Sequence, residues 1–191
     1  MTLNFDEVVT VVASRPRPLL VGIDGLPLAG KTTLALRLIR ELGADCLWLD
    51  DLVKEEAEWS SRDQPSFPFD YIRYDAFMDS VRDLAQSRRC SFFPYDWETG
   101  RVSEEPRVVN GDGIALVEGV SALHPQLAPL YDLKIWVESD PATTLQASLK
   151  RGVGSWAREW ELMFLPSVEL YLRTAPKARA DIIALGREAM E

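Results

Sequence analysis

The sequence predicts an α/β fold of three layers, in which a parallel sheet is covered by helices on both faces. Short apolar runs of strand length alternate with segments of helical periodicity, which is the pattern of parallel sheets buried on both faces. The chain has 191 residues, 47% of them hydrophobic, enough for one sizeable core, so we expect a single domain over residues 1–191. We expect five strands, over residues 19–23, 46–49, 114–117, 133–137 and 180–185.

Helices are predicted between these strands from apolar residues at helical spacing. The helix after the first strand, for example, has Leu34 and Leu38 on one side. Further helices are expected over residues 3–13, 74–87, 141–151 and 166–174. Two additions to the layers are also expected: an insertion over about 54–110, which contains a small hairpin, and a lid over about 150–165.

A phosphate-binding loop is predicted between the first strand and its helix. The octapeptide Gly25–Thr32 fits the spacing G-x-x-x-x-G-K-[ST], whose glycines let main-chain amides curl around an anion at a helix N-terminus. Pro27 has no amide hydrogen, so the later amides, from Ala29 through Thr33, are expected to bind the phosphates. Lys31 is also expected to stabilise charge during catalysis. The candidate nucleotide-binding residues are Gly25, Leu28, Ala29, Gly30, Lys31, Thr32 and Thr33.

Carboxylates follow several of the predicted strands. Asp24 follows the first strand, Asp50 and Asp51 end the second, and Glu118 follows the third, so these acids are expected to meet beside the phosphate loop. Phosphoryl transfer needs held phosphates, a metal ion and a carboxylate near the acceptor hydroxyl. We predict that Asp50 accepts the proton of that hydroxyl, with Asp51 as the alternative. Thr32 and Glu118 are predicted to hold Mg²⁺.

Basic side chains are expected to close over the phosphates from the predicted lid. Lys150, Arg151 and Arg158 lie in or beside it, and mobile cations of this kind stabilise transferring charge and exclude water. We therefore predict catalytic roles for Arg151 and Arg158. Trp156 and Trp160 are predicted to pack the lid against the body of the protein rather than to contact a ligand.

Composition excludes several classes of protein. The formal net charge of −9 argues against general binding to nucleic acids or anionic membranes. No apolar run is long enough for a membrane span and the acidic N-terminus does not look like a signal peptide, so we expect a cytoplasmic location. Cys46 and Cys90 have no metal-like spacing, and the one histidine, His124, is expected in a surface turn. A homodimer is compatible with the sequence, but no residue pattern requires it.

Several motifs, in order along the chain, resemble the uridine kinase and phosphoribulokinase-like group of P-loop kinases. They are the phosphate loop, Leu49-Asp-Asp51, Pro94-Tyr-Asp-Trp97, Val117-Glu-Gly119, Tyr131-Asp-Leu-Lys-Ile135 and Ala180-Asp-Ile-Ile183. The loop alone occurs in many families, whereas the aspartates after the second strand combined with VEG and YDLKI are more specific. The resemblance extends over most of the chain, from about Leu19 to Leu185.

The resemblance implies a nucleoside/nucleotide kinase-like P-loop fold that transfers the γ-phosphate of ATP, with Mg²⁺, to a hydroxyl of a nucleoside, a sugar or a cofactor precursor. It implies that Asp50 is the base, that Glu118 lies near the metal ion, and that Arg151 and Arg158 contact phosphates. Uridine kinases typically carry a histidine at the position of Gly100, so the identity of the acceptor stays open. The candidate acceptor-binding residues are Asp51, Tyr95, Asp96 and Arg101.

Two other functions remain open from the sequence. A nucleoside monophosphate kinase would bind its acceptor phosphate with arginines, and Arg73, Arg88, Arg89 and Arg101 lie in the acceptor-side insertion. A nucleotide-binding switch or ATPase would need no enclosed acceptor site. The aromatic segment Phe92–Trp97 and the predicted lid favour an enclosed site, and therefore a kinase.

Overall fold

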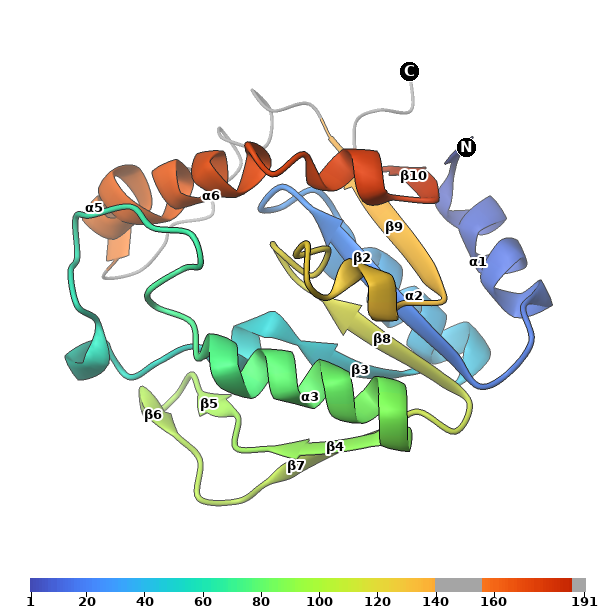
Figure 1. Cartoon of the computed structure of the whole chain (residues 1–191), viewed down its shortest axis with the longest axis horizontal. Coiled ribbons are helices and arrows are strands. Elements are labelled where there is room, and N and C mark those ends of the chain that lie inside the picture. Colours follow the sequence, from blue (N-terminus) through green and yellow to red (C-terminus); the bar gives the residue numbers. More distant parts are fainter. Residues whose placement is uncertain (140–155, 187–191) are drawn as a thin grey trace.

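The computed structural model describes residues 1–139 and 156–186 of the chain (Figure 1). The helix predicted over 141–151, the candidate residues Lys150 and Arg151, and the first part of the predicted lid lie outside the described residues.

A parallel sheet of six strands forms the centre of the molecule, in the order β1-β10-β9-β2-β8-β3. Five of these strands are those predicted from the sequence. The sixth, β1, pairs in parallel with β10 at the edge and corrects the expected number. The strands are β1 (Thr2–Leu3), β2 (Leu19–Gly25), β3 (Asp45–Trp48), β8 (Ile114–Glu118), β9 (Leu133–Glu138) and β10 (Ile182–Leu185).

The additional strand uses residues next to a helix that begins later than expected. Helix α1 (Phe5–Ser14) starts after Asn4, whose side chain accepts a hydrogen bond from the Glu7 amide at 3.0 Å. The Glu7 carboxylate accepts one from the Asn4 amide at 2.8 Å. This reciprocal capping box fixes the start of the helix and leaves Thr2–Leu3 extended beside β10.

Helices cover both faces of the sheet, as predicted. Helices α1 and α2 (Lys31–Leu42) pack on one face, and α3 (Tyr74–Ser87) and α6 (Leu165–Leu172) pack on the other (Figure 1). Short helical segments connect the larger elements. They are η1 (Leu49–Leu52), η2 (Glu56–Glu58), η3 (Ala128–Leu130), α5 (Ala157–Glu159), η5 (Trp160–Phe164) and η6 (Pro176–Arg179).

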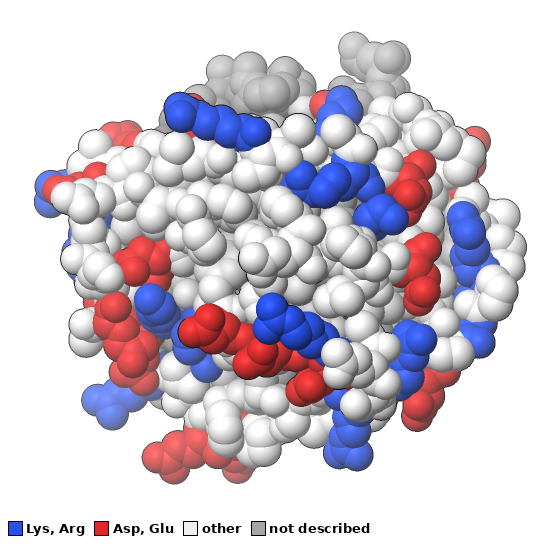
Figure 2. Space-filling model, in the orientation of Figure 1, with Lys and Arg blue, Asp and Glu red and all other residues white. Residues whose placement is uncertain are grey.

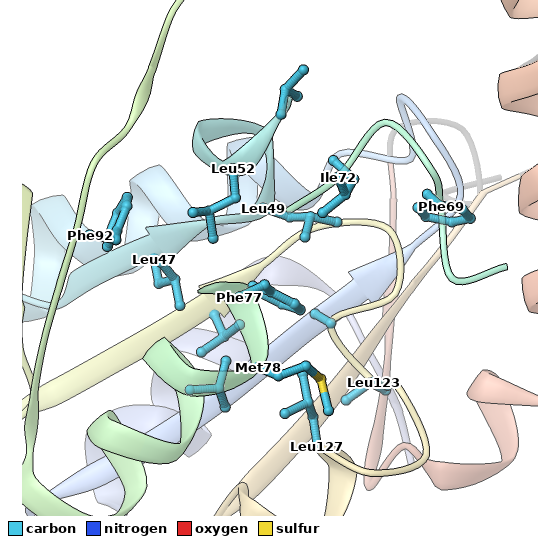
Figure 3. Packing of buried hydrophobic residues seen from close by; sticks show 14 of the residues in the cluster. Leu47, Leu49, Leu52, Phe69, Ile72, Phe77, Met78, Phe92, Leu123 and Leu127 are labelled. Atoms are coloured by element: carbon cyan, nitrogen blue, oxygen red, sulfur yellow. The ribbon is translucent and has the colours of Figure 1, made fainter. Parts of the chain in front are cut away.

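Two hydrophobic cores result from the alternation of side chains along the strands. Leu20 of β2 joins the core on the side of α3 and α6, whereas its neighbour Val21 joins the core beneath α1 and α2. Figure 3 shows the first of these cores, where Phe77 of α3 packs near Leu47 of β3. The second core contains Cys46, which is buried, as expected for a small core residue.

Two antiparallel hairpins lie in the insertion below α3 in Figure 1. The predicted hairpin pairs β5 (Tyr95–Asp96) with β6 (Arg101–Val102), and Gly100 adopts a φ of 71° at its turn. A second hairpin, which the sequence did not predict, pairs β4 (Arg89–Phe92) with β7 (Arg107–Asn110). Unlike the equally short strands of the central sheet, its strands begin with arginine and do not form apolar runs, so they give no strand signal.

The surface carries charges of both signs. On the face shown in Figure 2, acidic and basic side chains lie side by side over and around α3. In the part of the chain that the structure describes, no helix is both long enough and apolar enough to span a membrane. His124 is buried at 9% exposure, so the expected surface position is wrong; its ring packs near Phe67 and Tyr74.

Candidate active site

The phosphate-binding loop joins β2 to α2. Gly30 has a φ of 104° at the N-cap of α2, and Leu28 has a φ of 61°, so the main chain curls tightly between strand and helix. Glycine adopts such a left-handed conformation without steric cost. Lys31 is buried, and its ammonium group donates a hydrogen bond to the Leu26 carbonyl at 2.9 Å. A curled loop before a helix N-terminus is the geometry that binds phosphate.

A cavity of about 490 Å³ opens beside this loop. Two of the predicted nucleotide-binding residues lie outside its described lining. Gly25 donates its amide hydrogen to Asp24, and Ala29 is fully buried and donates its own to the Leu26 carbonyl at 3.2 Å. These two residues support the loop from within. The predicted residues that line the cavity are Leu28, Gly30, Lys31, Thr32, Thr33, Asp50 and Glu118.

Asp50 and Asp51 lie in η1, directly after β3, and have different surroundings. Asp50 lines the cavity together with Lys31 and Glu118. Asp51 accepts a hydrogen bond from its ion-pair partner Arg107 of β7, and burial raises its pKa while Arg107 opposes that shift. Of the two aspartates, Asp50 therefore faces the space in which an acceptor hydroxyl would lie.

Glu118 ends β8 and is buried at 5% exposure. Burial raises the pKa of its carboxyl group to about 7; Lys31 lowers this pKa, whereas the nearby carboxylates of Asp50 and Asp24 raise it further. The ionised form therefore depends on positive charge within the cavity.

The oxygen atoms of the cavity fit a magnesium ion. Thr32, Asp50 and Glu118, which line the cavity, offer a hydroxyl and two carboxylates, and Mg²⁺ prefers such hard donors. Within residues 1–139 and 156–186, no cluster of three or more His, Cys, Asp or Glu side chains is placed to hold a metal ion. Mg²⁺ commonly binds to one or two carboxylates and takes its remaining ligands from water and substrate phosphates.

Asp24 does not face the cavity, although the sequence places it at a strand end. It is fully buried, and its carboxylate accepts hydrogen bonds from the amides of Gly25 (2.7 Å), Ser121 (3.1 Å) and Leu123 (2.8 Å) and from the hydroxyl of Tyr171. Desolvation raises the pKa of Asp24, and these donors oppose the shift. The side chain thus connects the phosphate loop to the segment after β8 and to α6.

Three of the predicted acceptor-binding residues lie in the β5–β6 hairpin, outside the described cavity lining. Tyr95 is buried, and the Asp96 carboxylate accepts hydrogen bonds from the Glu98 and Thr99 amides, which holds the turn. Arg101 is exposed. The hairpin nevertheless contributes Trp97 to the cavity.

Aromatic side chains form much of the cavity wall, and the sequence interpretation missed their role. Trp156 and Trp160, expected only to pack, both line the cavity, and Trp156 also packs on Trp59 with ring centroids 5.2 Å apart. The available signal was composition: the chain has six tryptophans, and four of them line the cavity. The aromatic lining residues are Trp59, Phe69, Tyr71, Trp97, Trp156, Trp160 and Phe164.

Arg158, a predicted catalytic residue, is outside the described cavity lining. Its side chain is 74% exposed, and its guanidinium group lies 3.7 Å from the Asp63 carboxylate. A contact with ATP phosphates would require this side chain to move, so the role of Arg158 stays a prediction.

We expect substitution of Gly119 to distort the site. Gly119 has a φ of 156°, and a Cβ atom there would lie 2.3 Å from the Cβ atom of Leu49, next to Asp50. Gly119→Ala should therefore lower the free energy of unfolding by about 1–3 kcal/mol, as overpacking does. Chemical denaturation measures this change. Gly113→Ala is the control, because open space surrounds Gly113 and its substitution should be close to neutral; equal stability of both variants would contradict the expectation.

Comparison with known proteins gives a consistent result. No family model matches the chain. A uridine kinase from Clostridium perfringens is 25% identical over 152 residues, which cover 76% of this chain and 73% of that protein. A solved structure described as a possible uridine kinase from Bacillus stearothermophilus covers 94% of this chain and 96% of its own, with a TM-score of 0.72 and 23% identity. Phosphoribulokinase from Rhodobacter spheroides has the same fold at 13% identity, with a TM-score of 0.61 and coverage of 91% of this chain and 72% of its own.

The parallel sheet and the phosphate loop form an α/β fold that matches the fold of P-loop kinases. Over about three quarters of its length the chain is similar in sequence to uridine kinases, and it shares its fold with a possible uridine kinase and with phosphoribulokinase. These likenesses indicate a kinase that transfers a phosphate group to an alcohol hydroxyl.

Proposed function

We propose that the chain transfers the γ-phosphate of ATP, with Mg²⁺, to a hydroxyl of a small ring-bearing molecule such as a nucleoside. The main observation behind the proposal is that a single cavity contains both the phosphate loop and the residues expected near the acceptor. Lys31 and Thr32 of the phosphate loop, the carboxylates of Asp50 and Glu118, and the seven aromatic lining residues all line the same space. Donor phosphates and an acceptor of nucleoside size can thus meet within it.

Each group of residues in the cavity has a separate role in the proposed reaction. The loop amides and Lys31 hold the β- and γ-phosphates, and Asp50 takes the proton of the acceptor hydroxyl. The acceptor oxygen forms a bond to the γ-phosphorus, the bond from that phosphorus to the bridging oxygen breaks, and ADP leaves. Mg²⁺, held by Thr32 and Glu118, would supply neutralising charge to the phosphates.

An acceptor that already carries a phosphate fits this cavity less well. Arg73, one of the arginines considered for that role, donates to the main-chain carbonyls of Asp51, Val53 and Phe93, and so has a structural role. Arg88, Arg89 and Arg101 are outside the described cavity lining as well. These positions favour an acceptor without a phosphate group.

Loss of Lys31 should abolish nucleotide binding. ATP–Mg²⁺ at about 100 times its Kd stabilises a protein by about 2.7 kcal/mol, which raises the melting temperature of a chain of this size by roughly 5–10 °C. Lys31→Met should remove that upshift. Lys54→Met should keep it, because Lys54 pairs with Asp70 at 3.5 Å, outside the described cavity lining.

A screen of acceptors tests the reaction itself. ADP formation is measured with ATP–Mg²⁺ and, in turn, nucleosides, nucleoside monophosphates, sugars and vitamin precursors. Turnover that requires a hydroxyl acceptor without a phosphate supports the proposal. A clear preference for monophosphates would replace it with a nucleoside monophosphate kinase. Slow hydrolysis independent of every acceptor would favour a switch or ATPase, and an absent upshift in the wild type would reject nucleotide binding altogether.

A further inference from the structure

Six of the aromatic rings that line the cavity contact one another and form a continuous wall. We call it the aromatic wall; its members are Trp59, Tyr71, Trp97, Trp156, Trp160 and Phe164. Each ring contacts at least one other at centroid distances between 4.4 and 6.3 Å. The interplanar angles range from 57° to 90°, so the wall presents a mixture of ring faces and edges.

The indole N–H groups of two wall residues are bonded to groups outside the cavity lining. Trp156 donates to the Glu56 carboxylate at 2.7 Å, and Trp59 donates to the Lys54 carbonyl at 3.2 Å. Neither Glu56 nor Lys54 is among the described lining residues. These two tryptophans therefore offer a ligand the π-electron density of their rings and not a hydrogen-bond donor.

A cluster of charged side chains with an excess of negative charge lies beside the wall. Arg62 lies over the ring of Trp59, with its guanidinium carbon 5.2 Å from the centroid, and pairs with both Glu56 and Glu159. That cluster has one positive charge against two negative ones. Asp50 and Glu118 also line the cavity, and no described basic side chain lines it apart from Lys31 of the phosphate loop.

The pKa values of two tyrosines are raised in part by these nearby carboxylates. Burial, followed by the carboxylates of Glu56 and Glu55, raises the pKa of Tyr95, whose ring packs on Trp97 at 5.0 Å. Burial also raises the pKa of Tyr71, and the Asp50 carboxylate adds to that shift. Burial is the larger cause of both shifts, and the added contributions show that the carboxylates of Glu56 and Asp50 lie close enough to act on rings in and beside the wall.

We propose that the aromatic wall selects an acceptor whose hydroxyl is directed to Asp50 and whose other end is a flat, positively charged nitrogen heterocycle. The ring is held by cation–π contact and stacking, in place of the hydrogen bonds with which a polar pocket would bind a neutral base. This inference rests on the proposed function, since the hydroxyl reacts only if the chain is a kinase. It adds the chemical class of the acceptor.

Two matched pairs of compounds test the preference. Cytidine and 3-methylcytidine have the same sugar hydroxyls, and the second carries a positive charge at neutral pH. The other pair is 3-(hydroxymethyl)pyridine and its N-methylpyridinium derivative. Binding is measured by calorimetry and turnover by ADP formation with ATP–Mg²⁺. We expect the cation to bind about tenfold more tightly in at least one pair, as a partly desolvated cation–π contact provides.

Three variants separate charge from shape. Glu56→Gln keeps an acceptor for the Trp156 N–H but removes the charge, so it should weaken the cations by several-fold and leave the neutral partners unchanged. Trp156→Leu should lower affinity for both and reduce the cation preference. Phe93→Leu is the control, because Phe93 is an exposed aromatic residue outside the described cavity lining.

The two proposals fail in distinguishable ways. If the neutral compound of each pair binds as well as its cation, or if Glu56→Gln changes both equally, the wall has no charge preference and the inference is overturned, even if phosphorylation occurs. If ATP–Mg²⁺ gives no thermal upshift and no compound is phosphorylated, the kinase proposal itself fails.

Discussion

Asp50→Asn is expected to lower kcat by about 100-fold or more while leaving the affinity for ATP–Mg²⁺ at the wild-type level. A positioned general base contributes about 10²–10⁴ to the rate of a proton transfer, and an amide cannot accept the proton. ATP affinity should persist because Lys31, Thr32 and the loop amides, which are proposed to hold the phosphates, are unchanged. Steady-state kinetics with the acceptor found in the screen, and calorimetric titration with ATP–Mg²⁺, measure the two quantities.

Asp51→Asn is the matched control for this prediction. The two aspartates are adjacent in η1, but Asp51 pairs with Arg107 and Asp50 lines the cavity. We expect Asp51→Asn to lower the melting temperature and to keep most of the turnover. If the Asp51 variant loses turnover and the Asp50 variant retains it, the base has been assigned to the wrong residue.

The parts of the fold that the sequence predicts well are those determined by local patterns. The phosphate loop, helix α3 and the buried strands have apolar periods or fixed spacings that tertiary contacts reinforce. The missing strand β1 is only two residues long, and its extended state depends on pairing with β10, about 180 residues later in the chain. A pairing at that separation leaves no local signal in residues 2–3.

The candidate site likewise contains some residues that local sequence patterns predict and others that they do not. The spacing of the loop and the ends of the strands predict that Lys31, Asp50 and Glu118 come together, as the cavity shows. The aromatic wall could not be predicted, because its rings come from separate segments on both sides of α3 in the sequence. Within the Pro94–Trp97 motif, the sequence interpretation chose the wrong residues for the cavity. Tyr95 and Asp96 stabilise their own hairpin, whereas the next residue, Trp97, lines the cavity.

The same contrast applies to Asp24, which the sequence groups with the catalytic acids. Its two oxygen atoms each accept hydrogen bonds from two donors: Gly25 and Ser121 on one, Leu123 and Tyr171 on the other. The three main-chain donors cannot rotate to accept in return. An ionised carboxylate satisfies all of these donors, so a group that looks functional in the sequence is instead a structural connection beneath the phosphate loop.

Asp24→Asn is therefore expected to lower the free energy of unfolding by about 2–4 kcal/mol, because an amide NH₂ group must face at least one buried main-chain N–H. For a chain of this size the melting temperature should fall by about 5–15 °C. Tyr171→Phe removes a single donor and should have a smaller effect. Asp181→Asn is the exposed control: Asp181 also accepts a main-chain hydrogen bond, from Lys134 at 2.8 Å, but water can replace it. Thermal and urea denaturation rank the variants, and an Asp24→Asn protein as stable as the Asp181 control would show that the buried carboxylate does not hold the phosphate loop to α6.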